Sequence, residues 1–142
     1  MSTEENTALV RRVFEEVFNR RHAGAIDELI APNYINHDIP APAPGIEGFK
    51  QIHALFLTAF PDIHITIEDE LSEGDKVATR GYFTGTHLGE FQGIPPTGRR
   101  IRVPYIDLWR VENGKLVENW VQLDRLGMLQ QLGVIPAPGQ AG

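Results

Sequence analysis

The strongest constraint on the fold is the stretch from Arg99 to Asp124, in which apolar and polar residues alternate on both sides of a short turn. Alternation at every second position is typical of β-strands, because successive side chains of a strand point to opposite faces. The turn at residues 112–114 contains Asn-Gly, a dipeptide that strongly favours a tight hairpin. The stretch therefore predicts two antiparallel strands joined by a hairpin turn.

One carboxylate interrupts the apolar face of the first strand. At every second position that face carries Ile101, Val103, Tyr105, Asp107, Trp109 and Val111. Burying a carboxylate costs free energy unless hydrogen bonds compensate, and the loss of water raises its pKa toward neutral pH. Asp107 is therefore either a candidate acid and base in a site, or a structural residue that bonds a backbone amide or lies at the wet edge of the sheet.

The length of the turn decides which residue lies opposite Asp107. A two-residue loop would place Trp120 there, whereas a three-residue loop with a bulge and Gly114 in the left-handed region would place Asn119 there. We favour the longer loop because it surrounds the carboxylate with an apolar face. The second strand would contribute to that face Val117, Asn119, Val121 and Leu123. Tyr105 and Asn119 would then be the nearest side chains able to hydrogen-bond Asp107.

Composition is typical of a globular protein with a single domain. The chain has 142 residues, of which 42% are hydrophobic and 23% are charged. The absence of cysteine excludes disulfides, thiolate nucleophiles and cysteine-ligated metals. A net charge of −6 disfavours nucleic-acid binding, and no apolar run reaches membrane-spanning length. With an acidic start in place of a signal peptide, we expect one cytoplasmic domain over residues 1–142, with a flexible tail from about residue 134.

The rest of the chain predicts helices first and strands afterwards. A capping box at Ser2 and Glu5 begins a helix that ends near Arg20. Further elements are expected as helices at 25–30 and 46–60, an extended or looped segment at 33–37, strands at 63–68 and 76–87, and a helix at 124–132 capped by Asp124. This order indicates an α+β fold, a curved antiparallel sheet packed by the N-terminal helices into a cone-shaped barrel with an internal pocket.

The opposite face of the hairpin is apolar in its middle as well. The residues expected there are Ile106, Leu108, Leu116 and Trp120. An exposed apolar patch of this kind marks a contact surface, and no helix remains to cover it. We therefore expect a homodimer that forms through the outer face of the sheet.

Six short motifs occur in order over nearly the whole chain. They are Pro61-Asp62, Gly74 to Val77, Gly85 to Phe91, Gly93 to Gly98, Asn113 to Trp120 and Leu129 to Gly133. Together they resemble the SnoaL-like polyketide cyclase family of the nuclear transport factor 2-like superfamily. The resemblance implies the α+β cone, commonly a dimer, and no metal or organic cofactor. It also implies closure of a ring in an aromatic polyketide by an intramolecular aldol reaction, with one carboxylate as acid and base.

Carried over residue by residue, the resemblance is incomplete. The acid/base aspartate of the family falls on Val121, which cannot transfer a proton. Pocket histidines of the family fall on Asp107 and Asn119, and a pocket glutamine falls on Tyr105. The pocket asparagine corresponds to Asn36. The carboxylate of the inner face therefore stands at Asp107 in this chain.

Three further residues are candidates for contact with a substrate. Trp109 shares the inner face with Asp107. His37 lies where the family's chain passes the pocket mouth, and it is either an acid/base group or simply exposed. His53, on the third helix, either reaches the cavity or is a core histidine bonded to a carbonyl. No pair of histidines has ligand spacing with a carboxylate, so we expect no metal site.

Three functions remain open from the sequence. The first is a cyclase, isomerase or lyase that acts on a small apolar or aromatic carbonyl compound, with Asp107 moving the proton. The second is a binding protein that kept the pocket after the ancestral carboxylate became Val121. The third is a hydrolase of the epoxide-hydrolase kind, which requires Arg80 to point inward and pair with Asp107. Neither a nucleic acid nor a membrane is expected as a partner.

Overall fold

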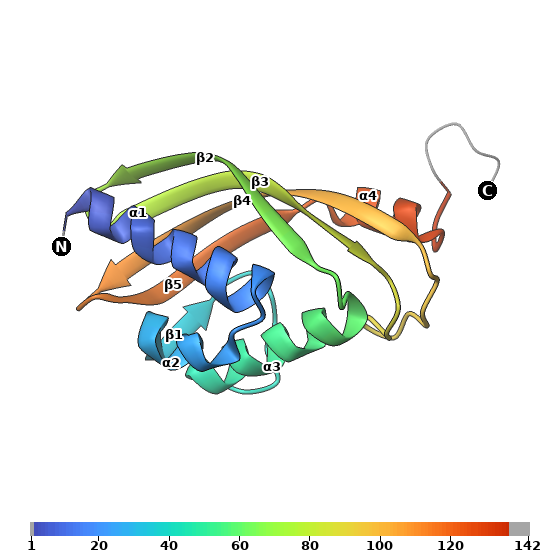
Figure 1. Cartoon of the computed structure of the whole chain (residues 1–142), viewed down its shortest axis with the longest axis horizontal. Helices are drawn as coiled ribbons and strands as arrows, with labels where there is room; N and C mark the ends of the chain where they lie inside the picture. The colour runs from blue at the N-terminus through green and yellow to red at the C-terminus, as the bar shows by residue number, and fades with distance from the viewer. Residues whose placement is uncertain (1, 137–142) are drawn as a thin grey trace.

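The computed structural model describes residues 2–136, and residues 137–142 of the expected tail lie outside the described part. Within residues 2–136, four α-helices, one π-helix, one short 3-10 helix and five strands make up the fold (Figure 1). In chain order the elements are α1 (Thr3–Arg12), the π-helix η1 (Val13–Asn19), the 3-10 helix η2 (Ala23–Ala25), α2 (Ile26–Leu29), β1 (Ile30–Asn36), α3 (Gly45–Ala59), β2 (His64–Glu73), β3 (Lys76–Thr86), β4 (Arg100–Glu112), β5 (Lys115–Leu123) and α4 (Arg125–Leu132).

The five strands form one curved sheet in the order β1-β5-β4-β3-β2. Figure 1 shows α1 lying across one side of this sheet, with α2 and α3 beyond it. The predicted α+β fold is confirmed. The sheet is open and mixed, because the segment expected as extended or looped around residues 33–37 is largely strand β1, which pairs parallel to β5. The other neighbouring strands pair antiparallel, as predicted.

The central hairpin combines features of both predicted turns. Its loop has two residues, Asn113-Gly114, with φ angles of 51° and 74°. The pairing then shifts by one residue at Val117, and this bulge places Asp107 opposite Val121. The predicted three-residue loop, with Asn119 opposite the carboxylate, is therefore wrong. The predicted inner face is nevertheless correct around Asp107. One extra residue reverses which side chains of β5 face inward, and it does so whether it lies in the loop, as predicted, or in the strand, as observed.

The same bulge corrects the prediction for Leu116. Leu116 pairs with Val111 and is fully buried in the core, so it does not lie on the outer face. Simple alternation fails here because the extra residue reverses the side-chain direction on the turn side of the bulge. Of the remaining outer-face residues, Ile106 is 60% exposed, and Leu108 pairs with Trp120 beside it.

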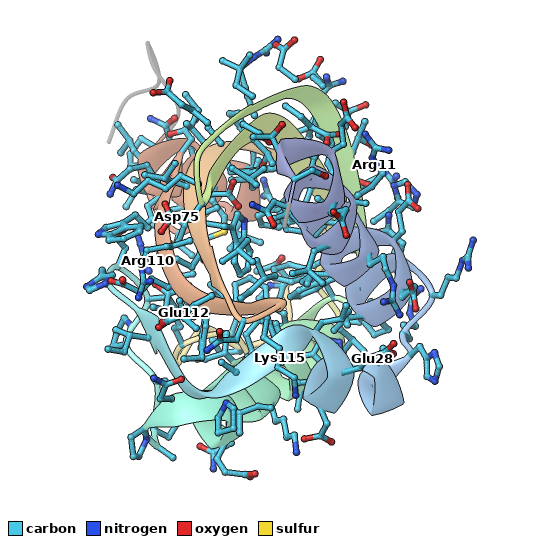
Figure 2. All side chains as sticks on the ribbon, turned by 90° about the vertical axis from the view of Figure 1, so that its left-hand side faces the viewer. Arg11, Glu28, Asp75, Arg110, Glu112 and Lys115 are labelled. Carbon is cyan, nitrogen blue, oxygen red and sulfur yellow. The ribbon has the colours of Figure 1, made fainter. Side chains whose placement is uncertain are left out.

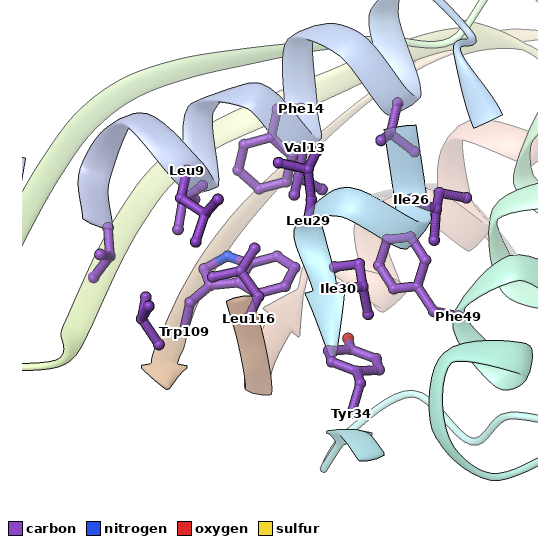
Figure 3. Packing of buried hydrophobic residues seen from close by; sticks show 14 of the residues in the cluster. Leu9, Val13, Phe14, Ile26, Leu29, Ile30, Tyr34, Phe49, Trp109 and Leu116 are labelled. Atoms are coloured by element: carbon purple, nitrogen blue, oxygen red, sulfur yellow. The ribbon is translucent and has the colours of Figure 1, made fainter. Parts of the chain in front are cut away.

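Two apolar clusters fix the helices to the sheet. The first joins α1, η1 and α2 to β1, β4 and β5, and Figure 3 shows Leu9 and Phe14 facing Trp109 and Leu116. The second joins the end of α3 and α4 to β3 and β4. Members of both clusters line the cavity described below. Burial of apolar side chains is the main source of stability in such a core.

The helix ends follow the predicted capping signals. Ser2 and Glu5 form the predicted capping box at the start of α1, and the Asp124 side chain accepts a hydrogen bond from the Gly127 amide at the start of α4. Charged pairs add to the attachment of the helices, and Figure 2 shows the charged groups around the outside. One such pair joins Arg11 of α1 to Glu70 of β2 at 2.9 Å. No helix in the described part is both long and apolar enough to cross a membrane.

Candidate functional site

A cavity of about 530 Å³ lies between the inner face of the sheet and α3. This volume lies within the range of small-molecule sites. Its wall is mostly aromatic and aliphatic, with the phenylalanines Phe14, Phe18, Phe49, Phe56 and Phe83. Residues 41–44 of the Pro/Ala segment also line it. The few polar side chains in the wall come from β1, β4, β5 and α3, and they are Tyr34, Asn36, His53, Tyr105, Asp107, Trp109 and Asn119.

Asp107 is held at the cavity wall by two side-chain donors. The carboxylate is 5% exposed. Its Oδ1 accepts a hydrogen bond from Thr79 Oγ1 at 2.5 Å, and its Oδ2 accepts one from Trp109 Nε1 at 2.8 Å. Burial raises the pKa of Asp107 to about 7, although both hydrogen bonds favour the charged form and limit the rise. Both protonation states are therefore populated near neutral pH, as a group that takes and returns a proton requires.

Thr79 is a site residue that the sequence did not single out. It lies directly opposite Asp107 on β3 and is 2% exposed. Since its hydroxyl proton is given to Asp107, the Tyr105 hydroxyl at 3.1 Å donates to Thr79 Oγ1. Tyr105 was predicted to hold the carboxylate directly, and it does so only through Thr79. Both faces of β3 mix polar and apolar side chains, so alternation alone does not tell which face is inside. The register against β4 shows that Thr79 is on the inner face.

The two predicted asparagines bind each other instead of the carboxylate. Asn36 Nδ2 donates to Asn119 Oδ1 at 3.3 Å, and Asn119 Nδ2 donates to the Leu108 carbonyl oxygen at 3.1 Å. Asn36 Oδ1 accepts from the amides of Asp38 and Ile39, where the chain leaves β1. The prediction that Asn119 holds Asp107 is therefore wrong. Both amides line the cavity while the protein already satisfies most of their hydrogen-bonding groups.

Tyr34 is a second site residue that the sequence did not single out. Its ring lies beside Trp109, with centroids 6.4 Å apart. Burial raises the pKa of Tyr34, and the charge of Asp107 adds to the rise, so the phenol stays protonated. The hydroxyl oxygen accepts a weak bond from Asn36 Nδ2 at 3.4 Å. Within residues 2–136 no acceptor takes the hydroxyl proton, which leaves Tyr34 as a donor at the cavity wall.

His53 both reaches the cavity and is a buried histidine bonded to a backbone carbonyl, so the two predicted alternatives hold together. The ring lines the cavity from α3, and its Nε2 donates to the Val17 carbonyl oxygen at 2.8 Å. The residue is 4% exposed, and burial lowers the pKa of the imidazole, which keeps it neutral. Val121 also lines the cavity and lies opposite Asp107 on β5.

His37 and Arg80 do not reach the cavity. His37 follows Asn36 in extended chain and points to the other side, where its ring stacks on Trp120 with centroids 4.7 Å apart. Its Nε2 lies 2.7 Å from Glu118 Oε2. Arg80 lies opposite Ile106 on the outer face and binds the carboxylates of Asp69 and Glu68. The predicted role of His37 at the pocket is therefore corrected.

The pairing of Arg80 with Asp107 that a hydrolase would need is not formed, because Arg80 points away from the inner face. Within residues 2–136, no three histidine or carboxylate side chains gather in the way a metal ion would require. The chemistry available at the cavity wall is therefore that of one buried carboxylate, one free phenol donor and one neutral imidazole.

Comparisons with known proteins agree with this architecture. The sequence profile of SnoaL-like polyketide cyclases matches residues 8–132. The chain is 32% identical over 137 residues to the aklanonic acid methyl ester cyclase DnrD of Streptomyces peucetius, a match that covers 94% of this chain and 92% of DnrD. It is 30% identical over 122 residues to the nogalonic acid methyl ester cyclase of Streptomyces nogalater, covering 82% of this chain and 89% of that one.

The structure of TsrD from Streptomyces laurentii superposes with a TM-score of 0.88 at 28% identity, covering 95% of this chain and 99% of TsrD. The profile match runs from within α1 to the end of α4, so it includes every element that lines the cavity. With fold, cavity and sequence in agreement over this length, the chain belongs to the SnoaL-like polyketide cyclase family.

Proposed function

We propose that this chain is an enzyme that removes a proton from the carbon beside a carbonyl group of a mostly apolar polyketide and thereby closes a ring. The observation that carries the proposal is Asp107, a carboxylate with a pKa of about 7 at the wall of an apolar cavity. A base acts best when its pKa lies near the working pH. The names of two relatives, cyclases of nogalonic and aklanonic acid methyl esters, support a polyketide methyl ester as the substrate class.

The proposed reaction keeps all atoms within one substrate molecule. The Asp107 carboxylate takes a proton from the carbon beside the first carbonyl, whose oxygen becomes an enolate and accepts a hydrogen bond from Tyr34. The enolate carbon then attacks a second carbonyl carbon, which forms the new C–C bond and an alkoxide. Protonated Asp107 returns its proton to that alkoxide. A donor fixed in place before the reaction lowers the barrier because it does not have to reorient as charge develops.

The neighbours of Asp107 act as positioning residues in this scheme. Tyr105 and Thr79 orient the carboxylate through consecutive hydrogen bonds, at 3.1 Å and 2.5 Å. Val121 stands directly across from Asp107 on β5. Since side chains opposite each other on neighbouring strands share one patch of surface, this pairing supports the idea that the base has moved from one strand to the next.

The proposal is tested with 2-tetralone, an apolar bicyclic ketone whose C1 protons are acidic. In D2O the wild-type protein is expected to accelerate exchange of these protons, followed by proton NMR. Asp107→Asn is expected to reduce the exchange catalysed by the protein by about 100-fold or more, since it removes the base. Its dissociation constant for 2-tetralone, measured by calorimetry, should stay within about threefold of the wild-type value, because Asn fills the same space. Equal exchange by the two proteins would remove Asp107 from the acid/base role.

One observation favours a second function, that of a binding protein. Both oxygens of Asp107 already accept hydrogen bonds from the protein. The resemblance adds that the family's acid/base aspartate would fall on Val121. In that case the wild-type protein would bind 2-tetralone without raising exchange above the rate in buffer. The same NMR measurement therefore separates the two functions.

We also propose that two copies associate through the outer face of the sheet. Ile106 is 60% exposed there, and Leu71, 75% exposed, lies on the same face through its pairing with Ala78, the neighbour of Leu108. Exposed apolar side chains that are adjacent across several strands support a contact surface. An isologous dimer would cover this face on both copies at once.

A further inference from the structure

The His53 side chain caps the C-terminal end of η1. Val17 lies in the last turn of this π-helix, where backbone carbonyls have no partner further along the helix. The Nε2 atom of His53 lies 2.8 Å from the Val17 carbonyl oxygen. Because a carbonyl oxygen only accepts hydrogen bonds, Nε2 must carry the proton. The fold thereby sets the tautomer of His53, with Nδ1 left as an acceptor.

The Nδ1 atom of His53 is the ring nitrogen that the Val17 contact leaves free. Among residues 2–136 this atom has no hydrogen-bond partner. Two other polar side-chain atoms of these residues lack a partner and are also fully enclosed, Asn6 Oδ1 and His87 Nε2. Nδ1 of His53 is not one of these enclosed atoms, although the residue as a whole is only 4% exposed. Since His53 lines the cavity, Nδ1 is the ring nitrogen that remains for a ligand bound there.

The surroundings of His53 offer no other polar group from the helix side. The remaining α3 side chains in the cavity wall are Phe49, Ile52 and Phe56, and the His53 ring meets the edge of Phe18 at 5.0 Å between centroids. The polar residues of the sheet side, including Asp107, form no hydrogen bond or ion pair with His53 among the described residues. The cavity therefore has a polar group on its helix wall that is separate from the polar cluster on its sheet wall.

We propose that the substrate carries a hydroxyl group that donates to His53 Nδ1, at a part of the molecule remote from the carbonyl that meets Asp107. The inference rests on the proposed function in taking this cavity as the substrate site. An acceptor without a partner in an apolar wall disfavours any ligand that covers it with carbon. A site that is built to receive a hydroxyl discriminates strongly against analogues that lack one. His53 thus acts as a specificity determinant, and the substrate class becomes a hydroxylated, mostly apolar carbonyl compound.

The test compares three probes built on the same bicyclic ketone: 2-tetralone, 6-hydroxy-2-tetralone and 6-methoxy-2-tetralone. Their dissociation constants are measured by calorimetry with the wild-type protein. The hydroxyl probe is expected to bind about five- to tenfold more tightly than both of the others, the effect of one net hydrogen bond. The unsubstituted probe is smaller and the methoxy probe is larger, so size cannot produce this order.

Two substitutions of His53 separate the acceptor from the contact with Val17. His53→Phe keeps the ring but removes both nitrogens, and it is expected to bring the three dissociation constants within about twofold of each other. His53→Gln can donate to the Val17 carbonyl oxygen and present its own oxygen to the cavity, so it should retain the preference for the hydroxyl probe. Ile52→Val is the matched control in the same wall, expected to shift all three constants alike.

Equal binding of the three probes by the wild-type protein would overturn the proposal, as would an unchanged preference in His53→Phe or the absence of binding by all three. The wild-type comparison alone can contradict it, even where His53→Phe does not fold. Asp107→Asn, which is expected to lose proton exchange, should still prefer the hydroxyl probe. Failure of the catalytic proposal and failure of this one are therefore seen in different measurements.

Discussion

Asp107 has its proton affinity set by two opposing effects. Removal from water raises the pKa of the carboxyl group, whereas the hydrogen bonds from Thr79 and Trp109 stabilise its charged form. The resulting pKa of about 7 depends on both donors remaining in place. At the scale of single residues, one substitution of a donor should therefore shift the pKa of Asp107 in a known direction.

Replacing Thr79 with valine tests that balance. Val has nearly the same shape but no hydroxyl, so the charged form of Asp107 loses one donor and its pKa rises further. Proton exchange from 2-tetralone requires the ionised carboxylate, so its rate should rise with pH to half of its maximum near the pKa of about 7 in the wild-type protein. In Thr79→Val this midpoint should move up by about one to two pH units. Thr79→Ser keeps the hydroxyl and should retain the wild-type midpoint. A midpoint in Thr79→Val that stays or falls would contradict the role of Thr79 as a donor to the charged carboxylate.

The raised pKa of Asp107 also predicts how stability depends on pH. Below about pH 4 the side chain is protonated in both the folded and the unfolded chain. Between that pH and the folded pKa of about 7 the unfolded chain has lost the proton and the folded one has kept it. The free energy of unfolding contributed by this group therefore falls as the pH rises.

Asp107→Asn lacks this titration. The free energy of unfolding of the variant minus that of the wild type should increase from about pH 4 to about pH 7, by up to about 4 kcal/mol, and then level off. Urea unfolding at several pH values measures this difference, in which the contributions of all other carboxyl groups cancel. A difference that stays flat or decreases with pH would show that the folded pKa is not raised.

At the scale of elements, the helices are tied to strand backbones as well as to the apolar core. Asn19, at the end of η1, donates from Nδ2 to the Ile65 carbonyl oxygen at 2.9 Å and accepts from the Ile65 amide at 2.7 Å. Gln131 of α4 makes the same paired contact with the backbone of Arg102, at 2.8 Å and 2.6 Å. Each carboxamide thus bonds both the N–H and the C=O group of one strand residue, as the backbone of a neighbouring strand would.

Asn19→Leu should therefore destabilise the protein although it keeps the branched shape of the side chain. Both backbone groups of Ile65 would lose their partner, so the free energy of unfolding is expected to fall by about 1 to 3 kcal/mol in urea denaturation. Arg11→Ala is the matched control, because it removes an exposed ion pair to Glu70 at the same junction of helix and strand. It should cost less than about 1 kcal/mol. Equal losses in the two variants would contradict the special role of the carboxamide.

At the scale of the whole molecule, the two faces of the sheet have different roles. Helices cover the inner face and leave a cavity, while the outer face carries Ile106, Leu108 and Trp120, which no helix of residues 2–136 covers. If two copies pair through that face, Ile106→Arg places a charge from each copy in the contact. The mass from light scattering should then fall from that of a dimer to that of a monomer. Leu55→Arg, on the exposed side of α3, should leave the mass unchanged, and an unchanged mass in Ile106→Arg would exclude this interface.

The sequence by itself determined the elements and most of their faces. Alternation over residues 99–124 established the central strands and placed Tyr105, Asp107 and Trp109 on the inner face, because side-chain direction in a strand is a local property. The capping box at Ser2 was readable for the same reason. The family motifs, which are also local, indicated the α+β fold.

Only the tertiary structure decided the partners of the site residues. Thr79 reaches Asp107 because of the register between β3 and β4, and the bulge at Val117 sets Val121 opposite Asp107. The tautomer of His53 follows from a carbonyl 36 residues away in the chain. Register, bulges and such long-range contacts depend on packing summed over the whole chain, so no local pattern can specify them. The sequence could therefore identify the carboxylate, while its pKa and its neighbours required the fold.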